Sequence, residues 1–358
     1  MTNTRLYVDF HVLQTVPPSC VNRDDTGSPK TAIYGGVTRA RVSSQAWKHA
    51  MREMFREELL DRKEVGERTK KVLQLIADEI AIIAPDQDAK ALAKKVLDKL
   101  GLKMAKKEGD LDALFFLSHD QARGLAQLAV EGCDDKKALQ AVLREQPSVD
   151  MVLFGRMVAG DSSLNYDAAA QVAHSISTHR VQNEYDYFTA VDDCAPEDNA
   201  GAGHLGTVEY NSSTLYRYAT VNVMELADHL GSEAAAKAVR VFAEAFMRSM
   251  PTGKQNTFAN RTLPDLVYVT VRDDQPVNLC GAFEQAVLPA QAGGYVTPSK
   301  ERLASHAKDV YASYTGDPLC AFAIGRGLED LAETVSMKDL LPALEQKMTA
   351  CLSRNEVE

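Results

Sequence analysis

A long stretch of helical composition, set between segments of strand composition, most limits what this chain can fold into. Over about residues 57–146 leucine, alanine, lysine and glutamate dominate, and strand signals are absent. The earlier segment Leu6–Leu13 alternates β-forming residues. One face of it carries Leu6, Val8, Phe10 and Val12. Strands separated by helices, with one helical insertion, predict an α+β fold.

The remaining secondary structure follows from the same signals. Turn residues predict a polar loop over Pro17–Gly36, and a helix is expected to begin at Ser43 or Ser44, either of which can act as N-cap. Evenly spaced β-forming residues predict a long ribbon over Tyr187–Val223, consistent with a protruding β-hairpin. The other predicted elements are strands over Val149–Val158 and Leu266–Val271, and helices over Ala168–Ile176, Ser232–Ser249, Lys300–Tyr311 and Lys338–Leu352.

The charge of the chain is distributed unevenly. The 358 residues include 40 basic and 50 acidic side chains, which gives a formal charge of −10. Averaged over the chain, this argues against a protein that coats itself with nucleic acid or binds an acidic membrane surface. The average hides a local reversal, because between Cys20 and Arg52 there are six basic residues and two acidic ones.

Cysteine usage and the absence of apolar runs indicate a cytoplasmic protein. The six cysteines are scattered and form no CxxC pair, so a zinc ribbon or a thioredoxin-like site is not expected. The first ten residues do not resemble a signal peptide, and no apolar run approaches the roughly 18 residues of a membrane span. We expect no membrane partner, no cofactor and no bound metal.

The segment Cys20–Arg52 has the features of a surface for phosphate groups. Gly35 and Gly36 would allow a ligand to approach the backbone closely. The predicted helix start offers amides and hydroxyls to an anion, and Lys48 and Arg52 follow one turn apart. An ordinary solvated charged surface is the alternative interpretation.

Eight segments carry a resemblance to a known family. They are HVLQTVPPSCVNRDD (His11–Asp25), AIYGG (Ala32–Gly36), RVSSQAWKHAMR (Arg41–Arg52), FGRM (Phe154–Met157), AHSISTH (Ala173–His179), DYFTAVDD (Asp186–Asp193), HLGTVEY (His204–Tyr210) and PTGKQNTFA (Pro251–Ala259). Together and in this order they resemble the Cas-seven family, the CasC backbone subunits of type I-E CRISPR Cascade complexes. The resemblance is weak across the helical insertion and beyond about Gly281.

The resemblance implies a hand-shaped subunit that is not an enzyme. Its palm is a modified RRM-like (ferredoxin-like) domain over residues 1–55, 150–190 and 217–358, with helical fingers over 56–149 and a β-hairpin thumb over 191–216. Copies would stack as a filament along one CRISPR RNA. The implied partners are CRISPR RNA, target DNA paired with the guide, other copies of the chain and other Cascade subunits. The protein would read backbone and shape, while base pairing reads sequence.

The family positions that contact RNA match a defined set of residues. The matched RNA-binding residues are Arg23, Lys30, Ser43, Ser44, Gln45, Lys48, Arg52, Met157 and Lys254. The matched thumb residues, near a displaced base, are Tyr187, Phe188, His204 and Leu205. Val37 and Thr38 stand where the family can carry further basic residues, so the palm is expected to rely more on Arg39 and Arg41.

Other interpretations of these residues remain open. Met157, Tyr187 and Phe188 are also typical core residues. Asp24 and Asp25 fit either a salt-bridged turn beside the preceding arginine or an acidic metal site. The second reading would make the chain an RNA-guided ribonuclease that cleaves target RNA with a divalent metal. A third alternative is an interaction protein that oligomerises without RNA.

Overall fold

The computed structural model describes residues 5–106, 109–158, 161–190 and 204–357. The strands are β1 (Tyr7–Ser19), β2 (Thr31–Tyr34), β3 (Val37–Val42), β4 (Glu67–Thr69), β5 (Phe115–Leu117), β6 (Ala170–Val172), β7 (Ser175–Ser177), β8 (Glu184–Ala190), β9 (His204–Asn222), β10 (Leu266–Arg272), β11 (Cys320–Ile324) and β12 (Glu333–Thr334). The α-helices are α1 (Ser44–Met54), α2 (Val72–Ile83), α3 (Ala89–Leu100), α4 (His119–Val130), α5 (Lys136–Arg144), α6 (Val149–Phe154), α7 (Val223–Leu230), α8 (Ser232–Arg248), α9 (Gln255–Phe258), α10 (Val296–Val310) and α11 (Met337–Val357). Short 3-10 or π-helical turns cover Phe55–Leu59, Arg62–Glu64, Ser162–Leu164, Leu279–Phe283 and Tyr311–Thr315.

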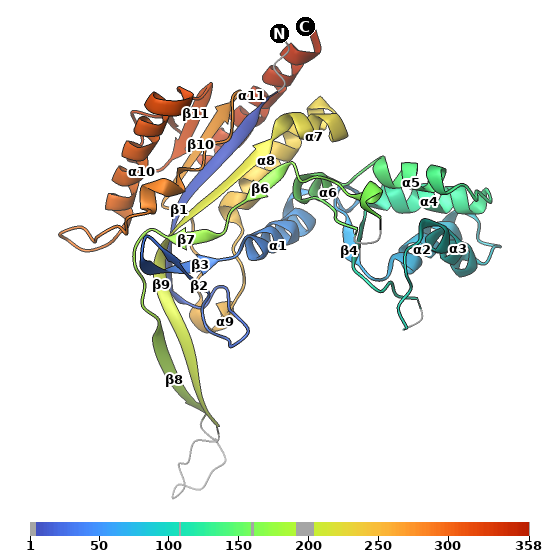
Figure 1. Cartoon of the computed structure of the whole chain (residues 1–358), viewed down its shortest axis with the longest axis horizontal. Coiled ribbons are helices and arrows are strands. Elements are labelled where there is room, and N and C mark those ends of the chain that lie inside the picture. Colours follow the sequence, from blue (N-terminus) through green and yellow to red (C-terminus); the bar gives the residue numbers. More distant parts are fainter. Residues whose placement is uncertain (1–4, 107–108, 159–160, 191–203, 358) are drawn as a thin grey trace, which may run out of the picture.

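One large sheet forms the centre of the molecule. Its main path runs β12-β11-β10-β1-β9-β7-β3-β2, and β6 and β8 also pair with β9. Helices lie against this sheet, and a helical region extends to one side of it (Figure 1). A sheet with packed helices and one helical extension agrees with the predicted mixture of strands and helices. The RRM-like description of the palm stays a prediction.

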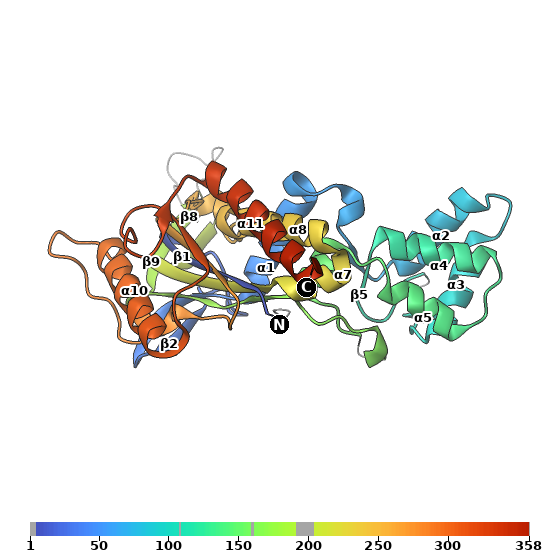
Figure 2. The ribbon, with the colours of Figure 1, turned by 90° about the horizontal axis from the view of Figure 1, so that it is seen from above.

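Strand β1 lies at the centre of the sheet, and both of its faces are buried. It pairs antiparallel with β9 on one side and with β10 on the other. Val8, Phe10 and Val12 pack in the core with α8 and α11, on the face that the alternation predicted. Leu13 on the other face packs in a second core under α10. Figure 2 shows α10 on one side of the sheet and α8 and α11 on the other.

The helical region has a hydrophobic core of its own. Helices α2 to α5 bury a separate cluster that includes Ile76, Leu97 and Leu125. These helices lie within residues 56–149, the range in which the sequence predicts an insertion. The region also carries a two-stranded ribbon, β4–β5, which its helical composition did not indicate.

A buried ion pair between α1 and α6 also holds the insertion, because Gly66 of the insertion bonds to both of its members. Nε of Arg52 donates to Oδ2 of Asp150 at 2.9 Å, and Nη2 donates to the Gly66 carbonyl. The other oxygen of Asp150 accepts from the Gly66 amide and the Ser148 hydroxyl. Gly66 has no room for a side chain, because a Cβ there would lie 2.6 Å from that hydroxyl. The carboxylate therefore fixes the β4–β5 ribbon against α1.

Two predicted elements have the opposite secondary structure. The sequence predicts a strand over 149–158, but Val149–Phe154 form helix α6, with buried residues on several sides. A short apolar run has no periodicity that separates a strand from a buried helix. The sequence also predicts a helix over 168–176, but β6 and β7 in this stretch pair with β9. The backbone groups of the distant strand β9 need partners, and that need overrides local propensity.

A β-hairpin projects from the sheet (Figure 1). Strand β8 pairs with residues 204–210 of β9, whereas residues 211–222 of β9 pair with β1 in the main sheet. All side chains of β8 are exposed. The described projection begins at Glu184, ahead of the predicted thumb boundary. Residues 191–203 of the predicted thumb lie outside the described residues.

We expect Asp150→Ala to lower the free energy of unfolding by about 3 to 5 kcal/mol, because it leaves the Arg52 guanidinium without its counter-ion. Urea unfolding followed by circular dichroism measures the loss. The matched control is Glu345→Ala, which removes a more exposed ion pair with Arg240 (2.7 Å) and should cost less than about 1 kcal/mol. Equal losses in the two variants would contradict the importance of the junction.

Buried Asp9 makes stability depend on pH. Burial raises its pKa from 3.8 to about 6, although the Tyr218 hydroxyl and the Val277 amide donate to its oxygens. The protonated form is favoured in the fold, so its stabilisation is present below pH 3.8 and is lost as pH rises through 6. Relative to Asp9→Asn, the unchanged chain should lose about 3 kcal/mol between pH 4 and pH 7 in urea unfolding. Parallel pH curves for the two proteins would refute this.

Candidate nucleic-acid interface

The loop after β1 is held in one shape by its own side chains. Asp24 accepts hydrogen bonds from the Thr26 hydroxyl and from the amides of Thr26 and Ser28. The Thr26 hydroxyl is the main cause that lowers the pKa of the Asp24 carboxyl. Asn22 accepts from the Ser43 amide, which ties the loop to the start of α1. The structure therefore assigns Asp24 to turn formation through amides and a hydroxyl, in place of the expected salt bridge.

A glycine brings Lys254 next to this loop from a distant part of the chain. A Cβ on Gly253 would lie 2.1 Å from the Val21 carbonyl oxygen, so the two backbones are in direct contact. Burial raises the pKa of Cys20, while the charges of Arg23 and Lys254 act in the opposite direction. Gly253, the residue before Lys254, lines the same open hollow as Arg23. Two predicted RNA-binding residues share one surface, although they are far apart in sequence.

Helix α1 begins where the sequence predicts. Ser43 is the N-cap, and its hydroxyl accepts from the Ala46 amide. Ser44 is half-buried and Gln45 is exposed. The first turn carries no acidic side chain, so nothing there opposes an anion. Lys48 follows with its Nζ 5.7 Å from the centre of the Phe154 ring, and burial lowers its pKa.

A second cationic group surrounds Arg41. Its Nε donates to the Thr31 carbonyl, and its Nη1 lies 3.2 Å from Nδ1 of His174. Because a guanidinium only donates, that histidine nitrogen accepts. Burial lowers the pKa of His174, and the charges of Arg41 and Lys30 lower it further. The structure brings the predicted Lys30 and Arg41 together, and it adds His174, for which the sequence indicated no role.

Arg39 is not available to RNA, contrary to the prediction. Its side chain is fully buried, and its guanidinium donates to the carbonyls of Ser177, Phe283 and Glu284. The same region occupies the space beside Gly35, where a Cβ would lie 1.7 Å from the Glu284 oxygen. Arg39 therefore fixes the β2–β3 turn against the body of the protein. These three carbonyls lie 138 to 245 residues away in the chain, so no local pattern could reveal this role.

An open groove of about 580 Å³ lies between α1 and the insertion, and we call it the junction groove. It is lined by Gln45, Lys48, His49, Arg52, Arg68, Leu114, Phe116, Phe154, Gly155, Arg156, Met157, Asn165, Tyr166, Asp167 and Ala168. Met157 is 84% exposed, which excludes the core interpretation. Arg52 is only 17% exposed and is held by Asp150, so its first role is structural. The groove joins four predicted RNA-binding residues from α1 and from the chain after α6.

The predicted thumb residues lie on the projecting hairpin. Tyr187, Phe188 and Leu205 are exposed there, which excludes core packing for the first two. The Phe188 ring covers Gly206, where a Cβ would lie 2.3 Å from it. His204 begins β9, and its side chain lies outside the described residues. Among the described residues, those that line the junction groove include none from the hairpin.

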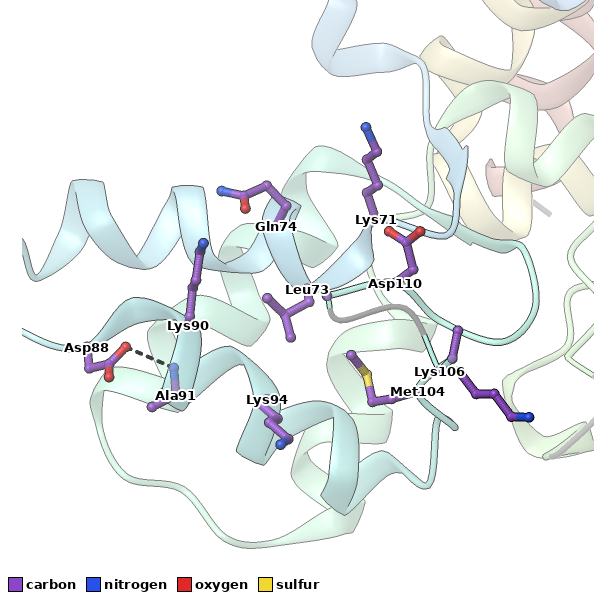
Figure 3. A pocket seen from close by; sticks show the side chains of 12 residues that line it. Lys71, Leu73, Gln74, Asp88, Lys90, Ala91, Lys94, Met104, Lys106 and Asp110 are labelled. Atoms are coloured by element: carbon purple, nitrogen blue, oxygen red, sulfur yellow. Dashed lines mark hydrogen bonds between the residues drawn. The ribbon is translucent and has the colours of Figure 1, made fainter.

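A larger hollow, of about 910 Å³, lies within the insertion and contains none of the predicted residues (Figure 3). Four lysines line it: Lys71, Lys90, Lys94 and Lys106. Asp88 and Asp110 also line it, and Asp88 accepts from the Ala91 amide at the start of α3. The sequence did not indicate this basic surface, because its lysines come from separate segments.

The described residues offer neither a metal-binding cluster nor a membrane-spanning helix. Among the described residues, no group of three or more His, Cys, Asp or Glu side chains is arranged to hold a metal ion. No helix in the same part of the chain has the length and apolar character needed to cross a bilayer. The exposed Asp25, the other acidic residue of the palm loop, therefore belongs to no such metal-binding group.

The chain is similar to a family model and to solved structures over nearly its whole length. The model described as "CT1975-like protein" matches residues 8–347. A chain of a "CRISPR RNA-guided surveillance complex, pre-nicking" is 34% identical with a TM-score of 0.84, and the match covers 96% of this chain and 100% of that one. A chain of a "CRISPR RNA-guided surveillance complex" is 30% identical with a TM-score of 0.64, covering 97% and 99%. No curated protein matches.

These matches support the resemblance at the level of the family. The two solved relatives exceed or equal 30% identity over almost the full length of both chains, which is more than a shared fold. The assignment to type I-E stays a prediction. The chain belongs to the CT1975-like protein family, and thus to the Cas-seven subunits that the N-terminal and central motifs indicated.

Proposed function

We propose that this chain is a non-catalytic CRISPR RNA-binding scaffold of a type I-E Cascade surveillance complex in the cytoplasm. Copies oligomerise as a helical filament along one guide RNA, beside other Cascade subunits. The filament presents the guide for pairing with target DNA in antiviral defence. The solved relatives are named as parts of CRISPR RNA-guided surveillance complexes, and the near-complete coverage of both chains supports an equivalent place for this one.

The junction groove is the observation that carries this proposal. It places the cation of Lys48 in the same hollow as the exposed apolar side chain of Met157. A nucleotide has a charged phosphate and a flat apolar base, so a cation beside an apolar side chain suits it. Arg23 and Lys254 extend the positive surface over the palm loop. Contacts of this kind position a backbone without selecting a sequence, as a guide-binding scaffold requires.

The hydrogen bonds of the palm loop favour a scaffold over a nuclease. Asp24 uses its carboxylate to accept from two backbone amides and one hydroxyl. These donors stabilise the charged form of the carboxylate and hold it against the loop. An acid committed in this way shapes the surface that presents the neighbouring Arg23.

Lys48→Ala tests the scaffold role. The complex co-expressed with a CRISPR array and its partner subunits should carry RNA, and the substitution should weaken binding equally for different guides. The slope of log affinity against log salt should fall by about one, because one phosphate contact is lost. The control Lys237→Ala removes a cation that pairs with Glu64 at 2.6 Å, and it should leave the slope unchanged.

Two results would contradict the scaffold role. One is a wild-type complex that elutes free of nucleic acid and fails to bind CRISPR RNA at low salt. The other is an effect of Lys48→Ala that depends on the guide sequence, because a phosphate contact carries no base information. A filament that survives ribonuclease treatment and forms from RNA-free subunits would favour oligomerisation without RNA.

Asp25→Ala tests the absence of catalysis. Assembled complex incubated with complementary RNA and magnesium should leave that RNA intact, with or without the substitution, and gel electrophoresis of end-labelled RNA measures this. Asp24→Ala should also produce no change in cleavage, although loss of the turn hydrogen bonds should weaken guide binding. Periodic cuts that disappear in Asp25→Ala would replace the scaffold by an RNA-guided ribonuclease.

A further inference from the structure

Arg68 lines the junction groove from the insertion, whereas Lys48 and Arg52 line it from α1. It lies on β4 and pairs in register with Phe116 on β5. Directly paired residues of an antiparallel ribbon project from the same face. Phe116 also lines the groove, so the ribbon presents both side chains to it. No sequence pattern singled out Arg68, and neither the family description nor the names of the relatives assign it a role.

The position of Arg68 is fixed by the junction. The Gly66 amide donates to Asp150 and its carbonyl accepts from Arg52, two residues before Arg68 in the chain. The Arg52 guanidinium also lies 4.6 Å from the centre of the Phe116 ring. The ribbon is therefore held to α1 at both of its strands. Arg68 faces the groove on a backbone that is already ordered.

Among the described residues, Lys48 and Arg68 are the groove cations that make no hydrogen bond or ion pair. Arg156 is buried and donates to the carbonyls of Phe116, Leu143 and Leu164, and His49 lies 3.4 Å from Glu53. Within the described part of the chain, the side chain of Arg68 makes no hydrogen bond or ion pair. The exposed Asp167 is the acidic residue of the lining.

The groove also has exposed apolar side chains, and its volume suits a nucleotide. Leu114 from the insertion is 54% exposed and Met157 is 84% exposed, and both line it. A volume of about 580 Å³ is within the range of pockets that hold a molecule of nucleotide size. Cations on both walls, together with apolar side chains from both walls, form an amphipathic site.

Building on the proposed function, we infer that the insertion supplies half of the nucleic-acid site. Arg68 binds a phosphate of a single strand that occupies the junction groove, across from Lys48. The base of the same strand packs on Leu114 and Met157. Arginine suits this position because its planar guanidinium can donate two hydrogen bonds to one phosphate. The strand is either the guide RNA or the DNA that pairs with it, and the experiment separates these sources.

Arg68→Gln in the co-expressed complex tests this inference. One arm measures assembly on CRISPR RNA, and the other measures binding of complementary single-stranded DNA to complex already assembled on its guide. In the arm whose strand occupies the groove, affinity should fall about five- to tenfold at 0.1 M salt, and the salt slope should fall by about one. Arg68→Lys should retain the slope, because it keeps the charge, while losing part of the affinity.

Arg62→Gln is the matched control. Arg62 is an exposed arginine of the same insertion that does not line the groove, so both salt slopes should equal those of the wild type. Unchanged slopes for Arg68→Gln in both arms, while Lys48→Ala lowers one, would overturn the inference and leave the proposed function intact. Failure of the wild-type complex to bind CRISPR RNA would overturn the proposed function itself.

A crosslinking measurement avoids any dependence on the folding of a variant. A 4-thiouridine guide, or a 4-thiothymidine target strand, in the wild-type complex should crosslink to peptides that contain Leu114 or Met157. Mass spectrometry of the digested complex identifies those peptides. Crosslinks that fall on other peptides in both arms would overturn the placement of a base in the groove.

Discussion

The ion pair between Arg52 and Asp150 is the interaction on which the candidate site depends. Asp150 is a fully buried carboxylate, and it is stable there because a guanidinium, an amide and a hydroxyl all donate to it. These donors come from α1, from the Gly66 turn and from Ser148. One carboxylate therefore sets the distance between the palm helix and the insertion. The junction groove exists because these two bodies are held apart at that distance.

Several arginines are buried and stabilise the fold. Composition alone would place these charged residues on the surface. Arg39 and Arg156 are buried and donate to backbone carbonyls from distant segments. Arg217 is buried with its guanidinium 3.7 Å from the centre of the Trp47 ring, and it donates to Gln14. Burial lowers the pKa of Arg217 to about 9 and that of Arg156 to about 10, so both remain charged at neutral pH. These side chains hold together segments that lie far apart in the sequence.

The sequence predicted the elements whose pattern is local. The helix start at Ser43 or Ser44 was confirmed, with Ser43 as the cap, and so was the apolar alternation along β1. Each signal depends only on residues within one helical turn or one strand. The sequence could not predict β6 and β7, because their partner strand β9 lies far from them in the chain. The sequence also gave no basis for assigning different roles to Arg39 and Arg41, because both lie on the same face of one strand. Only the fold brings the Phe283 and Glu284 carbonyls to Arg39.

Because only local patterns can be recognised in the sequence, it indicated some residues of the site and missed others. Lys48 and Met157 were found through motifs, but their shared groove depends on how the insertion docks on α1. Arg68 lies in the region where the resemblance is weak, and a single arginine in a helical composition has no pattern of its own. Its position depends on Gly66 and Phe116, which Arg52 anchors at the junction.

The net charge of −10 is compatible with RNA binding because the cations are divided by location. On the face of α8, Arg240 pairs with Glu345 and Arg248 with Glu58 and Glu244. Lys48 and Arg68 in the junction groove have no such carboxylate partner within the described chain. A phosphate that enters the groove therefore displaces water and counter-ions instead of an internal carboxylate, which favours binding. The cations of α8 already have carboxylate partners, so a phosphate has less to gain there than in the groove.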